Sequence, residues 1–178
     1  MKHIIKLYLL TILFVAIPVL AVDGLAVIDM RTAVLSTQAA ADAFKALEED
    51  ADYSSNLEEA QSLQAERQAI AEKLQKELET LSQPEITQMQ KDIQEKGKDL
   101  EFLAGKIQQA QEDTAAKVFN DSGAAMQKII SELITAKQIK VLLAKNETLL
   151  FSDPALDLTD DVTSMLDVAA SEASSQSD

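Results

Sequence analysis

Cysteine and tryptophan are absent from this 178-residue sequence, and histidine occurs once, at His3. Without cysteine the chain can form no disulfide and offers no thiol nucleophile, so its stability must come from packing or assembly. The commonest general base and metal ligand is confined to the first residues. With only four glycines, the sequence has no Gly-rich motif to hold nucleotide phosphates. We therefore expect a protein that is not an enzyme and that binds no cofactor or metal.

Basic and aromatic residues are also scarce. Sixteen Lys and Arg residues are outnumbered by 30 Asp and Glu residues, which gives a formal net charge of −14. Because phosphate binding needs clustered Lys and Arg, this acidity argues against a nucleic-acid partner. Two Tyr and five Phe residues offer little to fill a large globular core. The middle of the chain is rich in Ala, Glu, Gln, Lys and Leu, which favour long helices with thin cores.

Residues 1–21 have the pattern of a secretory signal peptide. Lys2 and Lys6 give a positive start, and an apolar run at 7–20 ends in residues that suit a cleavage site. The run is shorter than the roughly 20 residues that a helix needs to span a bilayer, so a stable membrane anchor is not expected. We expect an exported mature chain that starts near Val22. Loss of the two lysines takes its formal charge from −14 to −16.

The segment that follows, residues 22–36, is predicted to begin a small β body. Leu25–Asp29 is a short apolar run with β-branched residues behind Gly24, which indicates a strand. A short helical turn is plausible over Arg31–Ser36.

Residues 37–136 are predicted to form a long helical hairpin. Thr37 can cap a first helix that runs to about Leu81. Polar residues interrupt the helical pattern at Asp50–Asn56, where we expect a bend and not a domain boundary. The hairpin would therefore be one continuous arm.

The tip of this arm is predicted near residues 82–85. Pro84 cannot continue a helix from its N-terminal side, but it is tolerated in the first turn of a new one, where Ser82 and Glu85 match a capping box. The second helix runs to Ala136, so two helices of similar length can fold back antiparallel. Its apolar stripe could zip the two helices together, which the spacing favours, or form a ligand-binding seam. This stripe includes Ile86, Met89, Ile93, Leu100, Leu103 and Ile107.

After the arm, residues 137–167 are expected to complete the body. Gln138–Ala144 and Thr148–Phe151 are separated by a short turn and predict a β hairpin. A last amphipathic helix is expected to be capped around Thr159. Residues 168–178 are mostly Ser, Ala and acidic residues and predict a disordered tail.

A three-stranded β patch of this size is too small to be stable alone in water. Its apolar residues need cover, and self-association would also remove its exposed edges. We therefore predict a homotrimer whose interface includes Leu25, Val27, Val141, Leu143, Leu149 and Phe151. The fold class predicted is α+β, mostly α: a long antiparallel helical hairpin on a small β-strand trimerisation body.

Two segments resemble the Skp/OmpH family of periplasmic chaperones: LAVIDMRTAVL at 25–35 and, with higher specificity, KNETLLFSDPALDLTDDV at 145–162. The resemblance extends over residues 24–166. It implies a jellyfish-like homotrimer in the periplasm whose helical arms project as tentacles around a cavity. By resemblance, the cavity holds unfolded outer-membrane β-barrel proteins, and the protein is an ATP-independent holdase, a chaperone that binds clients and prevents their aggregation.

The runner-up hypothesis is a structural coiled-coil spacer or assembly adaptor of the cell envelope, which the same helices would suit. The family carries no catalytic residues to transfer. One departure is the charge, because members of the family are typically basic whereas this chain is acidic. For that reason the resemblance is not extended to lipopolysaccharide, and no lipid-binding residue is assigned.

Overall fold

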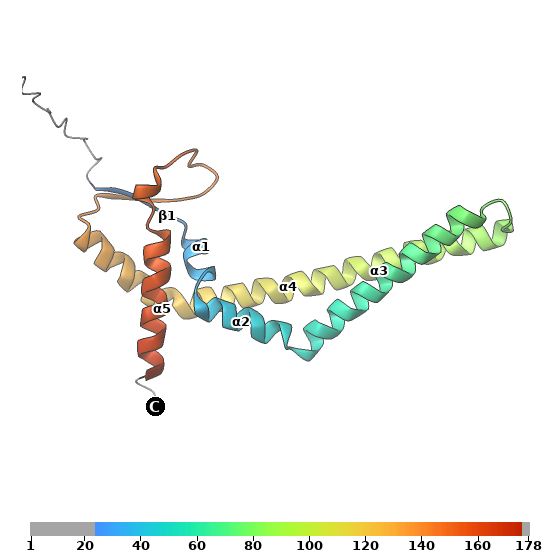
Figure 1. Cartoon of the computed structure of the whole chain (residues 1–178), viewed down its shortest axis with the longest axis horizontal. Helices are drawn as coiled ribbons and strands as arrows, with labels where there is room; N and C mark the ends of the chain where they lie inside the picture. Colours follow the sequence, from blue (N-terminus) through green and yellow to red (C-terminus); the bar gives the residue numbers. More distant parts are fainter. Residues whose placement is uncertain (1–23, 176–178) are drawn as a thin grey trace, which may run out of the picture.

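The computed structural model describes residues 24–175 and shows a small body at one end of a long helical arm (Figure 1). The expected signal peptide at 1–21 lies outside the described residues. No helix within residues 24–175 is both long and apolar enough to cross a membrane. In chain order, the elements are β1 (Leu25–Ile28), α1 (Met30–Leu35), α2 (Gln38–Glu48), α3 (Ala51–Glu77), α4 (Gln83–Ala136), β2 (Val141–Ala144), the 3-10 helix η1 (Pro154–Leu156) and α5 (Thr159–Ser175).

The arm consists of α3 packed antiparallel against the distal half of α4, as the sequence predicted (Figure 1). At the tip, the Glu85 carboxylate accepts hydrogen bonds from the Ser82 backbone N (2.8 Å) and from the Ser82 hydroxyl (2.6 Å). Pro84 lies in the first turn of α4, where its missing N–H costs nothing. These local contacts start the return helix at the predicted tip. The long helices and the small strand pair confirm the predicted fold class, α+β and mostly α.

A bend separates α2 from α3, at the start of the segment where the sequence predicted one. The Asp50 side chain caps α3 by accepting hydrogen bonds from the backbone N of Asp52 and of Tyr53. Residues 51–56 themselves are helical. Tyr53, in the first turn of α3, is buried, and Gln111 Nε2 of α4 donates a 2.8 Å hydrogen bond to its hydroxyl. This contact holds the bend to the opposite helix.

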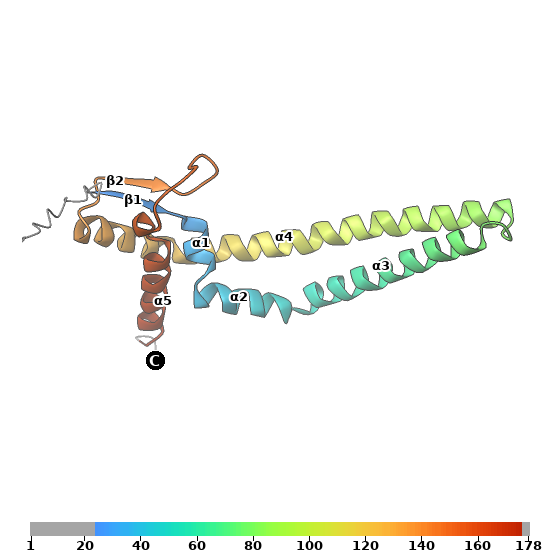
Figure 2. The ribbon, with the colours of Figure 1, turned by 45° about the horizontal axis from the view of Figure 1, so that its top comes forward.

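The β hairpin predicted after the arm is wrong. β2 pairs with β1 in parallel, in the register Leu25 with Val141 and Val27 with Leu143 (Figure 2). On the other side of β1, the Leu158 backbone N donates to the Val27 carbonyl oxygen (2.9 Å), so β1 lies between β2 and this later segment. A parallel pair needs a long crossover connection, and here α1 to α4 supply it.

The segment Thr148–Phe151, predicted as the second hairpin strand, is an irregular loop. The reason is local, because the Asn146 side chain accepts hydrogen bonds from the Thr148 backbone N (3.0 Å) and the Thr148 hydroxyl (2.6 Å). Such an Asx turn directs the chain away from β2.

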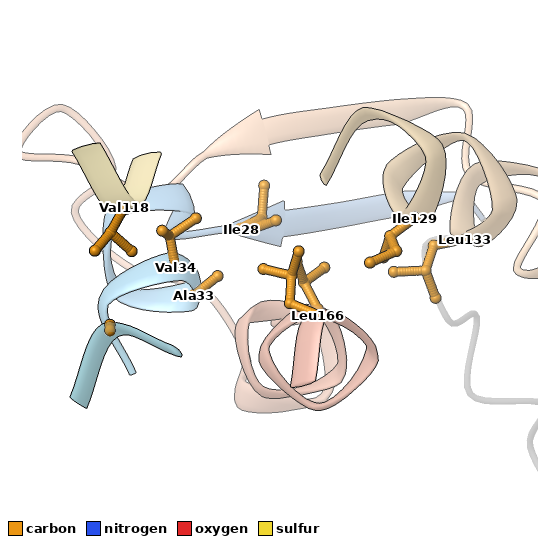
Figure 3. Close-up of a cluster of buried hydrophobic side chains, with 9 residues drawn as sticks. Ile28, Ala33, Val34, Val118, Ile129, Leu133 and Leu166 are labelled. Atoms are coloured by element: carbon orange, nitrogen blue, oxygen red, sulfur yellow. The ribbon is translucent and has the colours of Figure 1, made fainter. Parts of the chain in front are cut away.

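The core lies in the body, where α5 and α4 cover one face of β1 (Figure 3). Val34 and Val162 are fully buried in this core, whereas Val27 is fully buried on the opposite face of β1. The α5 helix continues through Ser175, so the disordered tail predicted for 168–178 is wrong for residues 168–175. Ala and Ser predominate in this stretch, and Ala is the strongest helix former.

We expect Ile129→Ala to lower the free energy of unfolding by about 3 kcal/mol, because it removes a buried side chain and leaves a cavity. Ile129 on α4 is 4% exposed, whereas Ile134 on the same helix is 38% exposed. The matched control Ile134→Ala should therefore cost less than about 1 kcal/mol. Urea unfolding followed by circular dichroism measures both values, and equal costs would contradict the assignment of the core.

Candidate functional site

The structure divides the six residues predicted at the interface into two groups. Val27 is 1% exposed and Leu25 is half-buried. Val27 shares a face of the sheet with its register partner Leu143, opposite the core formed with α4 and α5, and the chain's own η1 contacts β1. The expectation that β1 needs a partner chain for burial is therefore wrong for Val27. Leu149 is half-buried in the loop after β2.

The other three predicted residues are exposed: two lie on β2 and one lies in the loop that follows it. Val141 and Leu143 point away from the core on β2, while Leu142 between them packs against it. Phe151, in the loop that follows, is 82% exposed. Sequence reasoning missed Leu150, which is almost fully exposed, because a strand would have turned it to the opposite face from Phe151. We call Val141, Leu143, Leu150 and Phe151 the apolar crest.

β2 also has an open edge. The backbone N of Val141 donates to Gly24 and that of Lys145 donates to Ile28, both toward β1. Because backbone groups alternate along a strand, those of Leu142 and Ala144 point the other way. Within residues 24–175 no further strand pairs with that edge. An open edge beside exposed apolar side chains is suited to pairing with another chain.

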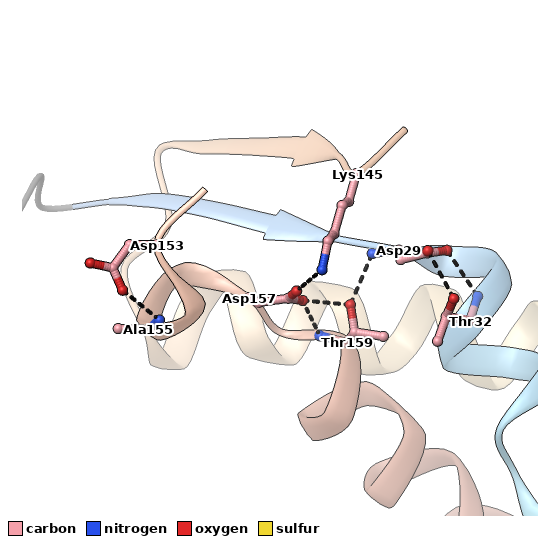
Figure 4. Close-up of polar contacts among 7 residues, drawn as sticks. All are labelled: Asp29, Thr32, Lys145, Asp153, Ala155, Asp157 and Thr159. Carbon is pink, nitrogen blue, oxygen red and sulfur yellow. Dashed lines mark hydrogen bonds and ion pairs between the residues drawn. The ribbon is translucent and has the colours of Figure 1, made fainter. Parts of the chain in front are cut away.

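A cluster of polar side chains holds the loop after β2 against the body (Figure 4). Lys145 Nζ lies 2.6 Å from Asp157 Oδ2, and the Thr159 backbone N donates to Asp157 Oδ1 (3.0 Å). The Thr159 hydroxyl in turn accepts a 3.0 Å hydrogen bond from the Asp29 backbone N. These contacts connect β1, the end of β2 and the start of α5.

The carboxyl groups of this cluster are shifted toward the charged form. Partial burial would raise the pKa of Asp157, but the hydrogen bonds from Lys145 and Thr159 lower it below its ordinary value. The same pair raises the pKa of Lys145, and hydrogen bonds from Thr32 lower the pKa of Asp29. All of these groups are engaged in structural contacts. No group of three or more metal-binding side chains occurs in the part of the chain that the structure describes.

A cavity of about 510 Å³ lies between this polar cluster and the loop that follows β2. Lys145 and Asp157 line one part of it, and Leu150 and Phe151 line another. The cavity therefore has a polar part and an apolar part.

The apolar stripe of the arm is only partly covered in one chain. Leu103 is buried between α3 and α4, but Ile86, Ile93, Leu100 and Ile107 remain half-buried. The interpretation that the stripe zips the hairpin is therefore correct for its centre. Ion pairs such as Lys96 with Glu66 join the two helices at the margins. A two-helix arm has no third element to cover the remaining apolar surface.

A family model described as outer membrane protein (OmpH-like) matches residues 24–166. Among solved structures, the chain is similar to a Caulobacter crescentus CB15 protein described as an OmpH-like outer membrane chaperone. The identity is 22%, the match covers 82% of this chain and 85% of that chain, and the TM-score is 0.46. No curated protein matches the sequence.

We expect Asp157→Asn to destabilise the body near neutral pH and to have little effect in strong acid. A carboxyl group whose pKa is lowered by folding contributes stability above its ordinary pKa, and this contribution is lost as the pH falls through the lowered value. The difference in melting temperature between the wild type and the variant should therefore shrink below about pH 4. The exposed Asp153→Asn variant, which affects only the cap of η1, is the control. A difference that does not change with pH would show that the Asp157 charge is not what matters.

Proposed function

Because the chain belongs to the OmpH-like family, we propose that it is an ATP-independent holdase chaperone that binds unfolded outer-membrane β-barrel proteins and prevents their aggregation. The family is one of chaperones of the Skp/OmpH type and is typically periplasmic. In this proposal the protein works in the bacterial periplasm and its clients lie in a cavity between helical arms. The observation that carries the proposal is an arm whose apolar stripe is left half-covered along its length.

The physical basis of binding is the uncovered part of the stripe. Burial of apolar surface is favourable and has no directional requirement, so one stripe can accept many client segments. The charged residues that flank the stripe keep the arm soluble between binding events. No step requires nucleotide or covalent chemistry.

We further propose that the chain is a homotrimer assembled through the apolar crest and the open edge of β2. The crest is too exposed to contribute to the fold of one chain, since Leu150 is 96% exposed and Phe151 82%. Pairing the edge of β2 with another copy would satisfy its free backbone groups and bury the crest. Three arms that project from one such body would enclose the client cavity.

The test of the holdase proposal uses the mature chain from Val22 and two unrelated outer-membrane barrels unfolded in urea. Each barrel is diluted with and without the protein, in the absence of ATP, and aggregation is followed by light scattering. We expect suppression for both clients at about one trimer per client. Failure with both would contradict the proposal and favour the envelope spacer, which should bind one fixed partner and protect neither barrel.

The trimer is tested with the double variant Val141→Asp and Leu143→Asp. Two carboxylates in the interface would be desolvated without partners, so we expect dissociation to monomers with helical content retained. The control Val168→Asp changes an equally exposed apolar residue on α5 (55% exposed, against 48% for Val141) and should leave the trimer intact. Size-exclusion chromatography with light scattering gives the masses. A double variant that remains trimeric would place the interface elsewhere.

A further inference from the structure

One face of α5 is hydrogen-bonded to the segment that leads into the arm. Thr159, Thr163 and Asp167 are spaced four residues apart, so they lie on the same side of the helix. The Thr159 hydroxyl accepts a hydrogen bond from the Asp29 backbone N (3.0 Å), and the Thr163 hydroxyl donates one to the Ala33 carbonyl oxygen (2.9 Å). These two contacts hold α5 to the body around α1.

The third residue on this face contacts α2, the helix that leads into the arm. Asp167 Oδ1 accepts a 2.8 Å hydrogen bond from the backbone N of Gln38, the first residue of α2. The first four N–H groups of a helix have no partner within the helix, and a carboxylate beside them is favourable. Asp167 therefore joins the body to the start of the arm. We call this hydrogen bond the α2–α5 contact.

Gly123 lies in α4 where α2 and α5 come together. A cavity of about 260 Å³ at this level is lined by Ser122 and Ala125 of α4, by Thr37 at the start of α2 and by Leu166 of α5. Apart from its neighbours in the helix, no atom lies within 4 Å of the position that a Cβ would occupy at Gly123, and its φ is not positive. Neither packing nor backbone conformation therefore requires glycine here. Because Gly destabilises a helix relative to Ala, α4 is weakened at this level.

The α2–α5 contact spans this weak point. α2 lies beside residues 114–122 of α4, on the arm side of Gly123, and lines a groove with them (Figure 1). α5 crosses residues 125–132 of α4, on the body side. A bend of α4 at Gly123 would therefore change the distance between α2 and α5, on which the hydrogen bond depends. The cavity among the three helices leaves room for this movement.

We propose that Asp167 is a positioning residue that fixes the direction of the arm, and that the arm swings about Gly123 when the α2–α5 contact opens. Hinges of this kind need only a few residues that absorb the change in backbone angles. In the proposed chaperone, the contact would set the width of the cavity between the arms. The movement itself is a property of the chain and does not depend on whether the protein binds clients.

The test measures the distance between two spin labels on the full mature chain by pulsed electron paramagnetic resonance. The chain has no cysteine, so the labels can be attached through Glu59→Cys on α3 and Gln127→Cys on α4. Both side chains are exposed, and they lie on opposite sides of Gly123 along the arm. Labelled chains are diluted with an excess of unlabelled chains, so that only distances within one chain are recorded.

We expect one narrow distance in the wild type. Asp167→Ala removes the acceptor and should raise the fraction of chains at other distances by about threefold to tenfold. Asp167→Asn keeps an oxygen acceptor at the same place and should behave nearly like the wild type. Gly123→Ala added to Asp167→Ala should lower that fraction by about fivefold, because Ala favours the unbent helix. The control Gly105→Ala makes the same change in the distal arm, also into open space, and should leave the fraction unchanged.

Two results would overturn the inference. If Asp167→Ala lowers the melting temperature but keeps the distances of the wild type, Asp167 stabilises the fold without positioning the arm. If the distances spread in Asp167→Ala and Gly123→Ala does not narrow them, the arm does not move about Gly123. The holdase proposal is tested separately by the suppression of barrel aggregation, so either idea can fail while the other stands.

Discussion

The parallel pairing of β1 with β2 is the constraint on which the rest of the structure depends. The two strands are separated in sequence by the whole arm, so they meet only if α4 returns the chain past α2 to the start of β1, where Val141 pairs with Leu25. The lengths of the outgoing and returning helices are therefore coupled, and the hydrogen bond between Gln111 and Tyr53 joins them near the bend at Asp50. Once β1 is placed, α5 covers it and the polar cluster around Asp157 connects the three segments.

The arm could be predicted from sequence because its signals are local. The capping residues Ser82 and Glu85, the position of Pro84 and a near-heptad stripe each act within a few residues, and all agree with the final fold. The strand order could not be predicted in the same way. Whether β2 pairs with the next segment or with β1 depends on the tertiary return of α4, and the Asx turn at Asn146 competes with a regular hairpin turn.

At the candidate interface, too, some features follow from the local sequence and others depend on the tertiary structure. Alternation along a strand predicts that neighbouring side chains face opposite ways, but not which face the protein's own helices cover. Val27 and Leu143 are paired in register on the same face, yet Val27 is buried and Leu143 is exposed, because η1 and the segment that leads to α5 contact β1. In the tail, the Ser, Ala and acidic composition predicts disorder, but Ala is the strongest helix former and residues 168–175 continue the helix whose Val162 and Leu166 are buried in the core.

A two-helix arm also explains why part of the apolar stripe stays accessible. Each helix has only one neighbour along most of the arm. The contact with that neighbour covers only part of the apolar stripe, so the rest of the stripe stays accessible. Covering it with a third helix would stabilise the arm and remove the surface that we propose binds clients. Acidic residues outnumber basic ones, so each protein molecule carries a net negative charge. The repulsion between these charges keeps the accessible stripes of different molecules apart. If the arm binds clients as proposed, the attraction must therefore act at short range, through burial of apolar surface.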